Sequence, residues 1–336
     1  EIQFVEEIKN SIPGLKTTLT FVDVILELSH LENLDIYITG SNSYMLSKDI
    51  LTQFRGKNKQ IKIHPLSYKE LADNFGHSDE LLSGYLRYGG MPYIYSRDIS
   101  RESLEEYLST LFEETYLTDI LERNKIHNDK STLDTILNVI ADSVGSIINP
   151  LNISNRFLTL KKKKISTETV DLYIQYFEDA FLISKINRQK IKTSDRYNYS
   201  YKLYFEDVGL RNARLNFQSK DFGFMMENVI YNFLIAKGYN VTVGVLPHDE
   251  KINSNITRKQ LEVDFVAERS NPKIYIQSTL QIDDETVKDR EIKPLNLIKD
   301  SFKKIVVVKD YIAPFYDEKG IYFVSLKDFL LDPSIV

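Results

Sequence analysis

The sequence predicts an α/β protein built from several domains. Its 336 residues exceed the length that one hydrophobic core usually serves, so two or more cores are expected. Short apolar runs that suit buried strands alternate with longer stretches that suit helices, and this alternation is typical of α/β folds. We expect four units in chain order, which cover residues 1–70, 71–128, 129–206 and 207–336.

The first unit is expected to hold part of a parallel sheet. Residues 34–41 read LDIYITGS, an almost continuous apolar run closed by small polar residues, which indicates a strand buried on both faces. Residues 61–63 resemble a second strand, and residues 18–28 and 47–54 suit helices that cover the sheet. The pattern then turns helical as far as about residue 126, which predicts a helical lid or linker as the second unit.

The third unit is expected to contain three helices followed by two strands. The predicted helices are residues 131–142, 153–160 and 168–180. The predicted strands are residues 181–187 and 201–205. This order resembles a winged helix-turn-helix, in which the third helix would be the recognition helix and the strands would form the wing.

A basic excess favours nucleic-acid binding by this third unit. Residues 156–202 hold 11 Lys and Arg against 5 Asp and Glu, which gives a charge of +6 within a chain of net charge −5. Four basic residues would lie on the wing and neutralise phosphates, namely Arg188, Lys190, Lys192 and Arg196. An alternative stays open, because Glu178 and Asp179 would repel a phosphate backbone. The winged helix would then serve packing or a protein contact.

The fourth unit is expected to be a separate α/β domain. Helices are predicted at residues 224–237 and 285–300. Strands are predicted at residues 241–245, 260–267, 273–280 and 304–309. The second helix would cross over between two parallel strands.

Three short sequences of the first unit carry a resemblance to a known family. They are ITGSNSYMLS at residues 38–47, FRGK at 54–57 and HPLSYKEL at 64–71, and the chain opens on Glu1-Ile2-Gln3. Together they resemble AAA-type ATPases of bacteria and archaea that carry a C-terminal domain of unknown function. The resemblance implies the sheet of a truncated P-loop NTPase. No stretch reads G-x-x-x-x-G-K-[ST], so the expected P-loop would lie before Glu1.

The resemblance also implies roles for five residues at a bound nucleotide. Glu1 would polarise the attacking water, and Ser41 or Asn42 would sense the γ-phosphate. Arg55 or Lys57 would supply positive charge, although the family usually has arginine where this chain has Lys57. ATP and magnesium are expected as cofactors of the complete protein only, because a chain without a phosphate cradle should not turn over ATP. The alternative is that the TGSN sequence is only a strand-to-loop turn.

Four residues of the fourth unit resemble the site of PD-(D/E)xK nucleases. Glu227 lies on the core-facing stripe of its helix, and Asp264 points away from the apolar face of its strand. Gln277 and Thr279 share one face of the next strand, where the nuclease family has E-x-K. A glutamine and a threonine replace neither the carboxylate ligand nor the cation, so a degenerate nuclease-like domain with little or no activity is expected. Glu227 and Asp264 could instead form a structural pair bonded to Arg290 or to a lysine.

The composition of the chain excludes several kinds of site and of protein. The chain has no cysteine, which excludes disulfides and thiolate zinc sites, and we expect no metal site in this chain. No apolar run reaches the roughly 18 residues that span a bilayer, so a cytoplasmic protein without a membrane partner is expected. The sequence therefore predicts part of an ATP-binding AAA protein with DNA or a protein as its partner. The alternatives are a non-catalytic nucleic-acid-binding or protein adaptor and a metal-dependent DNA nuclease.

Overall fold

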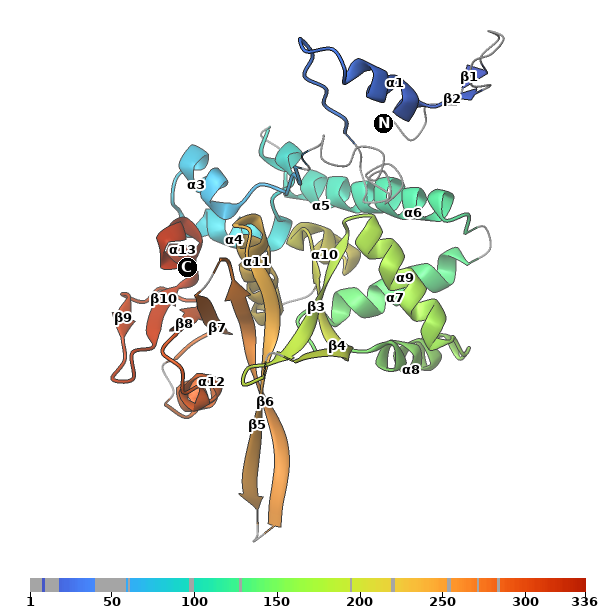
Figure 1. Cartoon of the computed structure of the whole chain (residues 1–336). Helices are drawn as coiled ribbons and strands as arrows, with labels where there is room; N and C mark the ends of the chain where they lie inside the picture. Colours follow the sequence, from blue (N-terminus) through green and yellow to red (C-terminus); the bar gives the residue numbers. More distant parts are fainter. Residues whose placement is uncertain are drawn as a thin grey trace.

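Eight strands in the second half of the chain form one continuous mixed sheet (Figure 1). Their order across the sheet is β4-β3-β5-β6-β7-β8-β10-β9. The strands are β3 (Ile183–Lys190), β4 (Arg196–Phe205), β5 (Asn240–Ile252), β6 (Asn255–Glu268), β7 (Lys273–Thr279), β8 (Lys303–Val308), β9 (Phe315–Tyr316) and β10 (Tyr322–Ser325). Strand β3 is parallel to β5, β7 to β8 and β8 to β10, whereas the other neighbours are antiparallel.

The computed structural model describes most of the chain beyond residue 60 and part of what precedes it. The described residues are 8–9, 18–39, 59, 61–96, 100–126, 129–193, 195–218, 221–252, 255–270, 272–282 and 285–336. No helix in these ranges is long and apolar enough to cross a membrane.

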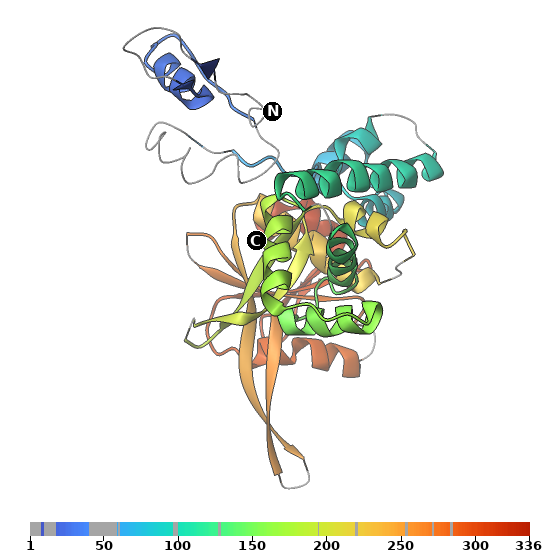
Figure 2. The same ribbon diagram turned by 90° about the vertical axis from the view of Figure 1, so that its right-hand side faces the viewer.

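Strand residues alternate between two hydrophobic cores on opposite faces of the sheet. In β8, Val307 belongs to the larger core and its neighbour Val306 to the smaller one. This is the period-2 geometry of a strand that is buried on both faces. Helix α11 (Phe222–Ala236) contributes to the larger core, and α12 (Glu285–Leu297) contributes to the smaller one. The sheet therefore lies between helices on both sides (Figure 2).

The strands and helices predicted for the fourth unit are confirmed, with different lengths. Strands β5 and β6 are much longer than predicted, and their hairpin extends beyond the rest of the sheet in both views (Figures 1 and 2). Helix α12 crosses over between the parallel strands β7 and β8, as expected. Strands β9 and β10 and helix α13 (Leu326–Leu331) were not predicted.

Helices fill the region between residues 68 and 123, as predicted. They are α3 (Tyr68–Phe75), α4 (Asp79–Tyr88), η3 (Pro92–Tyr95), α5 (Arg101–Thr110), η4 (Leu111–Leu117) and α6 (Thr118–Arg123). Helix α3 begins with a capping box, in which the Ser67 side chain accepts from the Glu70 N–H and the Glu70 carboxylate accepts from the Ser67 N–H. The sequence SYKE therefore specifies this helix start.

One buried carboxylate joins this helical region to the helix that follows β4. Asp207 caps α10 (Val208–Arg214) by accepting hydrogen bonds from two N–H groups of that helix, and its other oxygen accepts from Gly90 N at 2.7 Å. A Cβ atom at Gly90 would lie 2.0 Å from the carbonyl oxygen of Leu66, so glycine is required for this close approach. Burial raises the pKa of Asp207 to about 6, although the three N–H donors act in the opposite direction.

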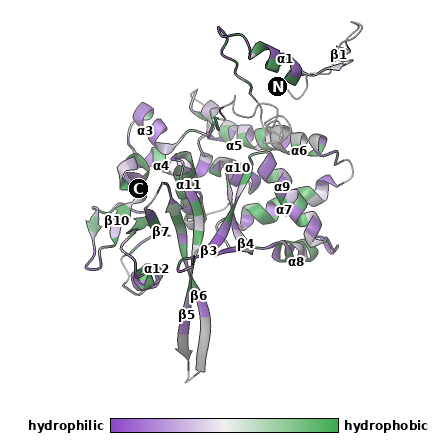
Figure 3. Cartoon of the chain, in the orientation of Figure 1, coloured by the Kyte–Doolittle hydropathy of each residue, from purple (hydrophilic) through white to green (hydrophobic). Residues whose placement is uncertain are grey.

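The three helices and the hairpin expected between residues 129 and 206 are present. The helices are α7 (Lys130–Asp142), α8 (Pro150–Lys161) and α9 (Thr167–Asp179), and they carry both hydrophobic and hydrophilic residues (Figure 3). The β3–β4 hairpin is not a free wing, because β3 also pairs in parallel with β5. The sheet thus crosses the expected boundary between residues 206 and 207.

The structure contradicts the two strands predicted in the first unit. Of the strand predicted at residues 34–41, residues 34–39 lie within the described ranges; they form no strand, and Tyr37 is 82% exposed. Residues 61–63 form no strand either, and Ile63 is 84% exposed. A buried strand needs neighbours for its N–H and C=O groups, and within the described ranges no strand pairs with either segment.

The first predicted helix is present and the second cannot be compared. Helix α1 (Phe21–Leu28) corresponds to the helix predicted at residues 18–28, and the short strands β1 (Ile8–Lys9) and β2 (Thr18–Leu19) precede it. Thr20 caps α1 in a capping box with Asp23. The helix predicted at residues 47–54 lies outside the described residues.

Candidate functional site

A buried lysine lies between two carboxylates in the interior of the protein. Lys202 Nζ is 2.6 Å from Glu227 Oε1 and 3.3 Å from Asp264 Oδ1. Tyr204 donates its hydroxyl hydrogen bond to the same oxygen of Glu227. The lysine is 4% exposed and the two acids are 8% and 9% exposed. We call these four residues the Lys202 cluster.

The Lys202 cluster is assembled from β4, α11 and β6. Lys202 and Tyr204 are two residues apart on β4, so their side chains leave the strand on the same face. The Asn228 side chain fixes α11 against β4, because it donates to the carbonyl of Phe205 at 2.7 Å and accepts from the Phe205 N–H at 2.9 Å. This pair of bonds places the neighbouring Glu227 beside Lys202 and Tyr204.

Asp264 lies where β6 and β7 stop pairing. The backbone ladder between these strands ends where Phe265 faces Ile276. Beyond that point the Asp264 carboxylate accepts from the Ser278 N–H at 2.9 Å and from its hydroxyl at 2.8 Å. The Asp264 N–H in turn donates to the side-chain carbonyl of Gln277 at 3.3 Å. Side chains therefore replace the ladder at the place where the carboxylate turns toward Lys202.

Gln277 and Thr279 have local partners of their own. The Gln277 amide nitrogen lies 3.5 Å from Glu291 Oε2 on α12, while its oxygen accepts from the Asp264 backbone. The Thr279 hydroxyl donates to the Gln281 carbonyl at 3.1 Å. The structure thus brings Gln277 next to Asp264, but it directs the Thr279 hydroxyl to the chain that follows β7.

Burial and charge act in opposite directions on the Lys202 cluster. Burial lowers the pKa of Lys202, but the carboxylates of Glu227 and Asp264 together raise that pKa above its ordinary value. Burial raises the pKa of Glu227 to about 7, because one ammonium does not offset both desolvation and the nearby Asp264. Burial also raises the pKa of Tyr204 far above its ordinary value, so its hydroxyl stays a donor.

The oxygen atoms of this cluster do not suit a divalent cation. Mg²⁺ requires oxygen ligands in near-octahedral geometry. Lys202 and Tyr204 occupy Glu227 Oε1, and Lys202 and Ser278 occupy the two oxygens of Asp264. No group of three or more His, Asp or Glu side chains that could hold a metal is present in the described ranges.

Arg188 is not placed on an exposed wing. It is 9% exposed, and its guanidinium donates to Gln260 Oε1 and Glu262 Oε1, each at 2.8 Å, and to Ser200 Oγ at 3.0 Å. The placement of Arg188 on a free wing is therefore wrong, because β3 also pairs with β5 and two side chains of β6, Gln260 and Glu262, engage the guanidinium.

The other three basic residues lie near the turn of the β3–β4 hairpin. Lys192 and Arg196 are exposed. Lys190 lies 3.4 Å from Asp195, whose carboxylate also accepts from the Thr193 hydroxyl at 2.7 Å. Binding of DNA by these residues stays a prediction.

The residues expected at a nucleotide cannot be placed. Glu1, Ser41, Asn42, Arg55 and Lys57 all lie outside the described residues. Their roles in binding ATP and magnesium stay predictions.

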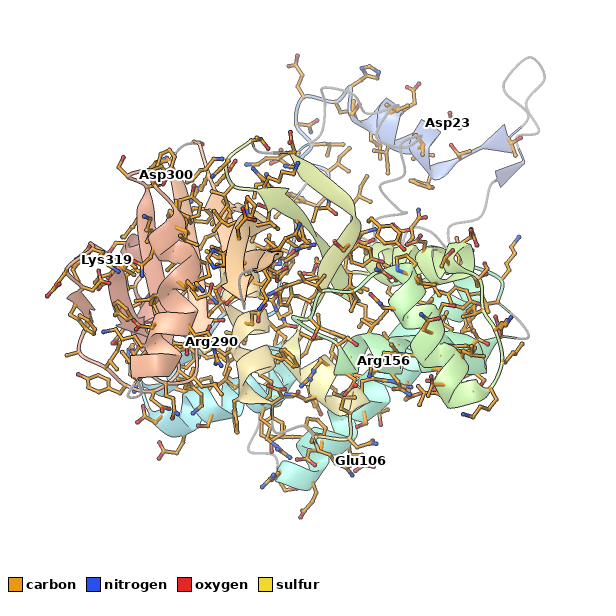
Figure 4. All side chains as sticks on the ribbon, turned by 90° about the horizontal axis from the view of Figure 1, so that it is seen from below. Asp23, Glu106, Arg156, Arg290, Asp300 and Lys319 are labelled. Carbon is orange, nitrogen blue, oxygen red and sulfur yellow. The ribbon has the colours of Figure 1, made fainter. Side chains whose placement is uncertain are left out.

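The sequence left open which lysine would be the partner of Glu227 and Asp264, and it did not indicate Tyr204; the lysine is Lys202. Arg290, which was considered as a partner of Glu227 and Asp264, lies on α12, and its side chain pairs with Glu291 and is 73% exposed (Figure 4). The available signal was YKLYF at residues 201–205, where a lysine interrupts a strand with apolar or aromatic neighbours on both sides. A lysine buried in such a strand requires a carboxylate partner.

Comparison with known proteins places the chain in a family. Residues 1–72 match the family described as AAA domain, and residues 79–221 match the family described as Domain of unknown function (DUF8612). An uncharacterized protein of Haemophilus influenzae is 32% identical over 338 residues, which cover 98% of this chain and 76% of that protein. This chain belongs to the family of the Haemophilus protein.

The comparisons also match this chain to two further proteins. The uncharacterized protein MJ1544 of Methanocaldococcus jannaschii is 34% identical over 275 residues, which cover 77% of this chain and 58% of that protein. The crystal structure of protein VC1899 from Vibrio cholerae aligns with 70% of this chain and 55% of its own at 13% identity. Its TM-score is 0.22, so it supports no conclusion about the fold.

Proposed function

We propose that this chain is part of an AAA-type ATP-binding protein whose C-terminal sheet is a nuclease-like module that does not cleave DNA. The AAA match at residues 1–72 and the sequences ITGSNSYMLS and HPLSYKEL support the ATP-binding half. ATP hydrolysis is proposed for the complete protein, because the P-loop that holds the phosphates is missing from these residues.

The position of Lys202 supports the non-cleaving half. Metal-dependent hydrolysis requires carboxylates that are open to a cation and a water that the cation activates. Here an ammonium 2.6 Å from Glu227 and 3.3 Å from Asp264 holds the two acids in an internal ion pair. Ser278 donates to the second oxygen of Asp264, and the Asp264 N–H donates to the Gln277 side chain. The arrangement stabilises the junction of β4, α11 and β6 and offers no place for a metal-bound water.

ATP hydrolysis tests the first half of the proposal. The protein expressed from its complete reading frame is expected to release phosphate from Mg·ATP, and residues 1–336 alone are expected not to do so. In the complete protein, Asn42→Ala is expected to lower the rate by at least about tenfold if it senses the γ-phosphate. Asp310→Asn serves as the control, because Asp310 is exposed and lies far from Asn42 in the sequence. Absence of both ATP binding and hydrolysis in the complete protein would contradict the proposal.

Plasmid cleavage tests the second half. Purified protein is expected to leave supercoiled plasmid intact in Mg²⁺ and in Mn²⁺. Cleavage that Asp264→Ala abolishes and Asp310→Asn preserves would establish the nuclease alternative instead.

The exposed basic residues of the β3–β4 hairpin favour a DNA-binding adaptor as the second candidate. Lys192 and Arg196 are exposed near its turn, so they can approach a phosphate backbone. If Lys192 and Arg196 contact DNA phosphates, the double variant Lys192→Ala with Arg196→Ala would bind duplex DNA more weakly at every sequence. Its slope of log affinity against log salt would fall by about 2. An unchanged slope would remove the hairpin from DNA binding.

A further inference from the structure

A groove lies between the three-helix region and the β3–β4 hairpin. It has a volume of about 480 Å³, and it runs between the start of α8, one face of α9 and strands β3 and β4. These elements lie side by side in Figure 1. A groove of this size falls within the range of sites that hold small molecules or one or two side chains of a partner.

The groove carries more negative than positive charge. Asp171 and Glu178 line it from α9, and Lys185 lines it from β3. Lys185 Nζ lies 4.1 Å above the centre of the Tyr201 ring. Burial raises the pKa of Glu178, although Lys185 acts in the opposite direction. A second cation in the groove would offset that cost of burial.

A buried hydroxyl in the groove has no partner. Tyr201 lines the groove and is 1% exposed, and its hydroxyl oxygen has no hydrogen-bond partner among the described residues. Burial, together with Asp171 and Glu178, raises the pKa of Tyr201, so the hydroxyl stays protonated. Native proteins rarely leave such a group unpaired, and a ligand that donates to it would satisfy it.

Exposed aromatic and aliphatic surface completes the groove. Tyr199 lines it and is 65% exposed, and Leu151 lines it from the start of α8 and is 47% exposed. An aromatic face in contact with solvent attracts a cation, and an aliphatic side chain covers the methylene groups of a long basic side chain.

We propose that this groove binds an arginine side chain of a partner polypeptide. The planar guanidinium carries a positive charge and five N–H donors, which match the carboxylates of Asp171 and Glu178 and the acceptor oxygen of the Tyr201 hydroxyl. Its flat face stacks on Tyr199, and Leu151 contacts its methylene groups. Lysine presents three donors from a single point and stacks less well, so it fits this set of groups less completely.

The same charges disfavour DNA at this face of α9. A phosphate backbone would meet Asp171 and Glu178 before any base edge, and like charges that approach within a few ångströms repel. This inference does not depend on ATP binding, so its failure would leave the proposed function untouched.

Methyl NMR with blocked five-residue peptides tests the proposal. The probes are glycine peptides with a central arginine, lysine or citrulline, and the reporters are the methyl groups of Leu151 and Ile174, which line the groove. The arginine peptide is expected to shift both signals in a saturable way. Citrulline keeps the shape and loses the charge, so its affinity is expected to be at least about fivefold lower.

Two variants separate binding from folding. Tyr201→Phe removes only the unpaired hydroxyl, so the melting temperature should stay the same or rise while affinity for the arginine peptide falls by about threefold. Asp171→Asn should weaken binding by about fivefold, whereas Asp179→Asn, on the same helix but outside the groove lining, should leave it unchanged.

Three results would overturn the proposal. One is the absence of methyl shifts with the arginine peptide at 10 mM, a concentration at which even a weak guanidinium site would be partly occupied. Another is equal affinity for arginine and citrulline. The third is a duplex DNA that shifts the same methyl signals and competes with the arginine peptide, which would assign the groove to nucleic acid.

Discussion

At the scale of single residues, the Lys202 ammonium lies between two carboxylates inside the protein and pairs with both. A buried charge without a partner is costly, and the cost falls on whichever groups remain after one partner is removed. Removing one member of the cluster is therefore expected to cost more unfolding free energy than the whole cluster contributes to stability. Its members can be tested one at a time.

Lys202→Met is expected to lower the free energy of unfolding by about 3 kcal/mol at pH 7.5, because it leaves Glu227 and Asp264 buried without their ammonium. The double variant Lys202→Met with Glu227→Gln is expected to lose less than the sum of the two single variants. Urea unfolding followed by circular dichroism measures both. A loss below 0.5 kcal/mol for Lys202→Met would mean that the ion pairs are not formed in solution.

Glu227 is expected to make stability depend on pH. Its pKa is raised from the ordinary value of 4.5 to about 7, so the folded state binds the proton more tightly than the unfolded state does. This contribution is fully present below pH 4.5 and is lost as pH rises through 7. Relative to Glu227→Gln, the native protein should lose about 3 kcal/mol of unfolding free energy between pH 4.5 and 7.5. A constant difference across this range would contradict the raised pKa.

At the scale of elements, substitutions at two glycines distinguish the effect of close packing, at Gly90, from the effect of helix propensity, at Gly84. A Cβ at Gly90 would meet the Leu66 carbonyl oxygen at 2.0 Å, whereas Gly84 in α4 has nothing within 4 Å. Gly90→Ala is expected to destabilise the protein by about 3 kcal/mol, because a backbone atom must move. Gly84→Ala is expected to stabilise it by about 0.5–1 kcal/mol. Thermal unfolding of both variants provides the comparison, and equal effects would contradict this docking of the helical region.

Most helices and the central strands could be predicted from the sequence, because their signals are local. Helix α9 follows from the core spacing of Val170, Tyr173, Ile174 and Phe177, all of which are buried. Strand β10 could not be predicted because four residues give too short a pattern. The apolar run at residues 34–41 predicted a strand that residues 34–39 do not form, because an apolar pattern does not supply a pairing partner.

Pairing between distant strands also limited the prediction of the site. No tight turn links β3 to β5, so nothing local indicates that they are parallel neighbours. That pairing covers Arg188 and makes the hairpin part of the same sheet as Asp264. Glu227 and Asp264 could be found from their own elements, whereas Lys202 could be joined to them only through this long-range pairing.

At the scale of the whole molecule, Glu206 links the last part of the first unit to the edge of the sheet. Its carboxylate lies 3.1 Å from Lys62 Nζ and 3.8 Å from His64 Nδ1, and it accepts from the Ser184 hydroxyl. Burial alone would raise its pKa, but His64, Lys62 and Ser184 lower that pKa to about 2. Lys62 and His64 lie within the AAA match, so this contact joins the AAA region to the rest of the chain.

Glu206→Gln is expected to loosen this connection and to expose residues 61–67 to proteolysis. Trypsin cleavage after Lys62 should become at least about threefold faster at pH 7.5, because the charged partner of the lysine is removed. Asp73→Asn removes the exposed partner of Lys69 on α3 and serves as the matched control, with no change in rate expected. Equal cleavage rates in all three proteins would show that Glu206 does not hold this segment.

The binding of Mn²⁺ to the intact protein tests most directly the claim that Lys202 occupies the place of a metal. Electron paramagnetic resonance counts free Mn²⁺ in the presence of the native protein and of Asp264→Asn. The two proteins are expected to leave the same amount of free Mn²⁺ at millimolar concentrations. A Mn²⁺ site that is present in the native protein and lost in Asp264→Asn would contradict it.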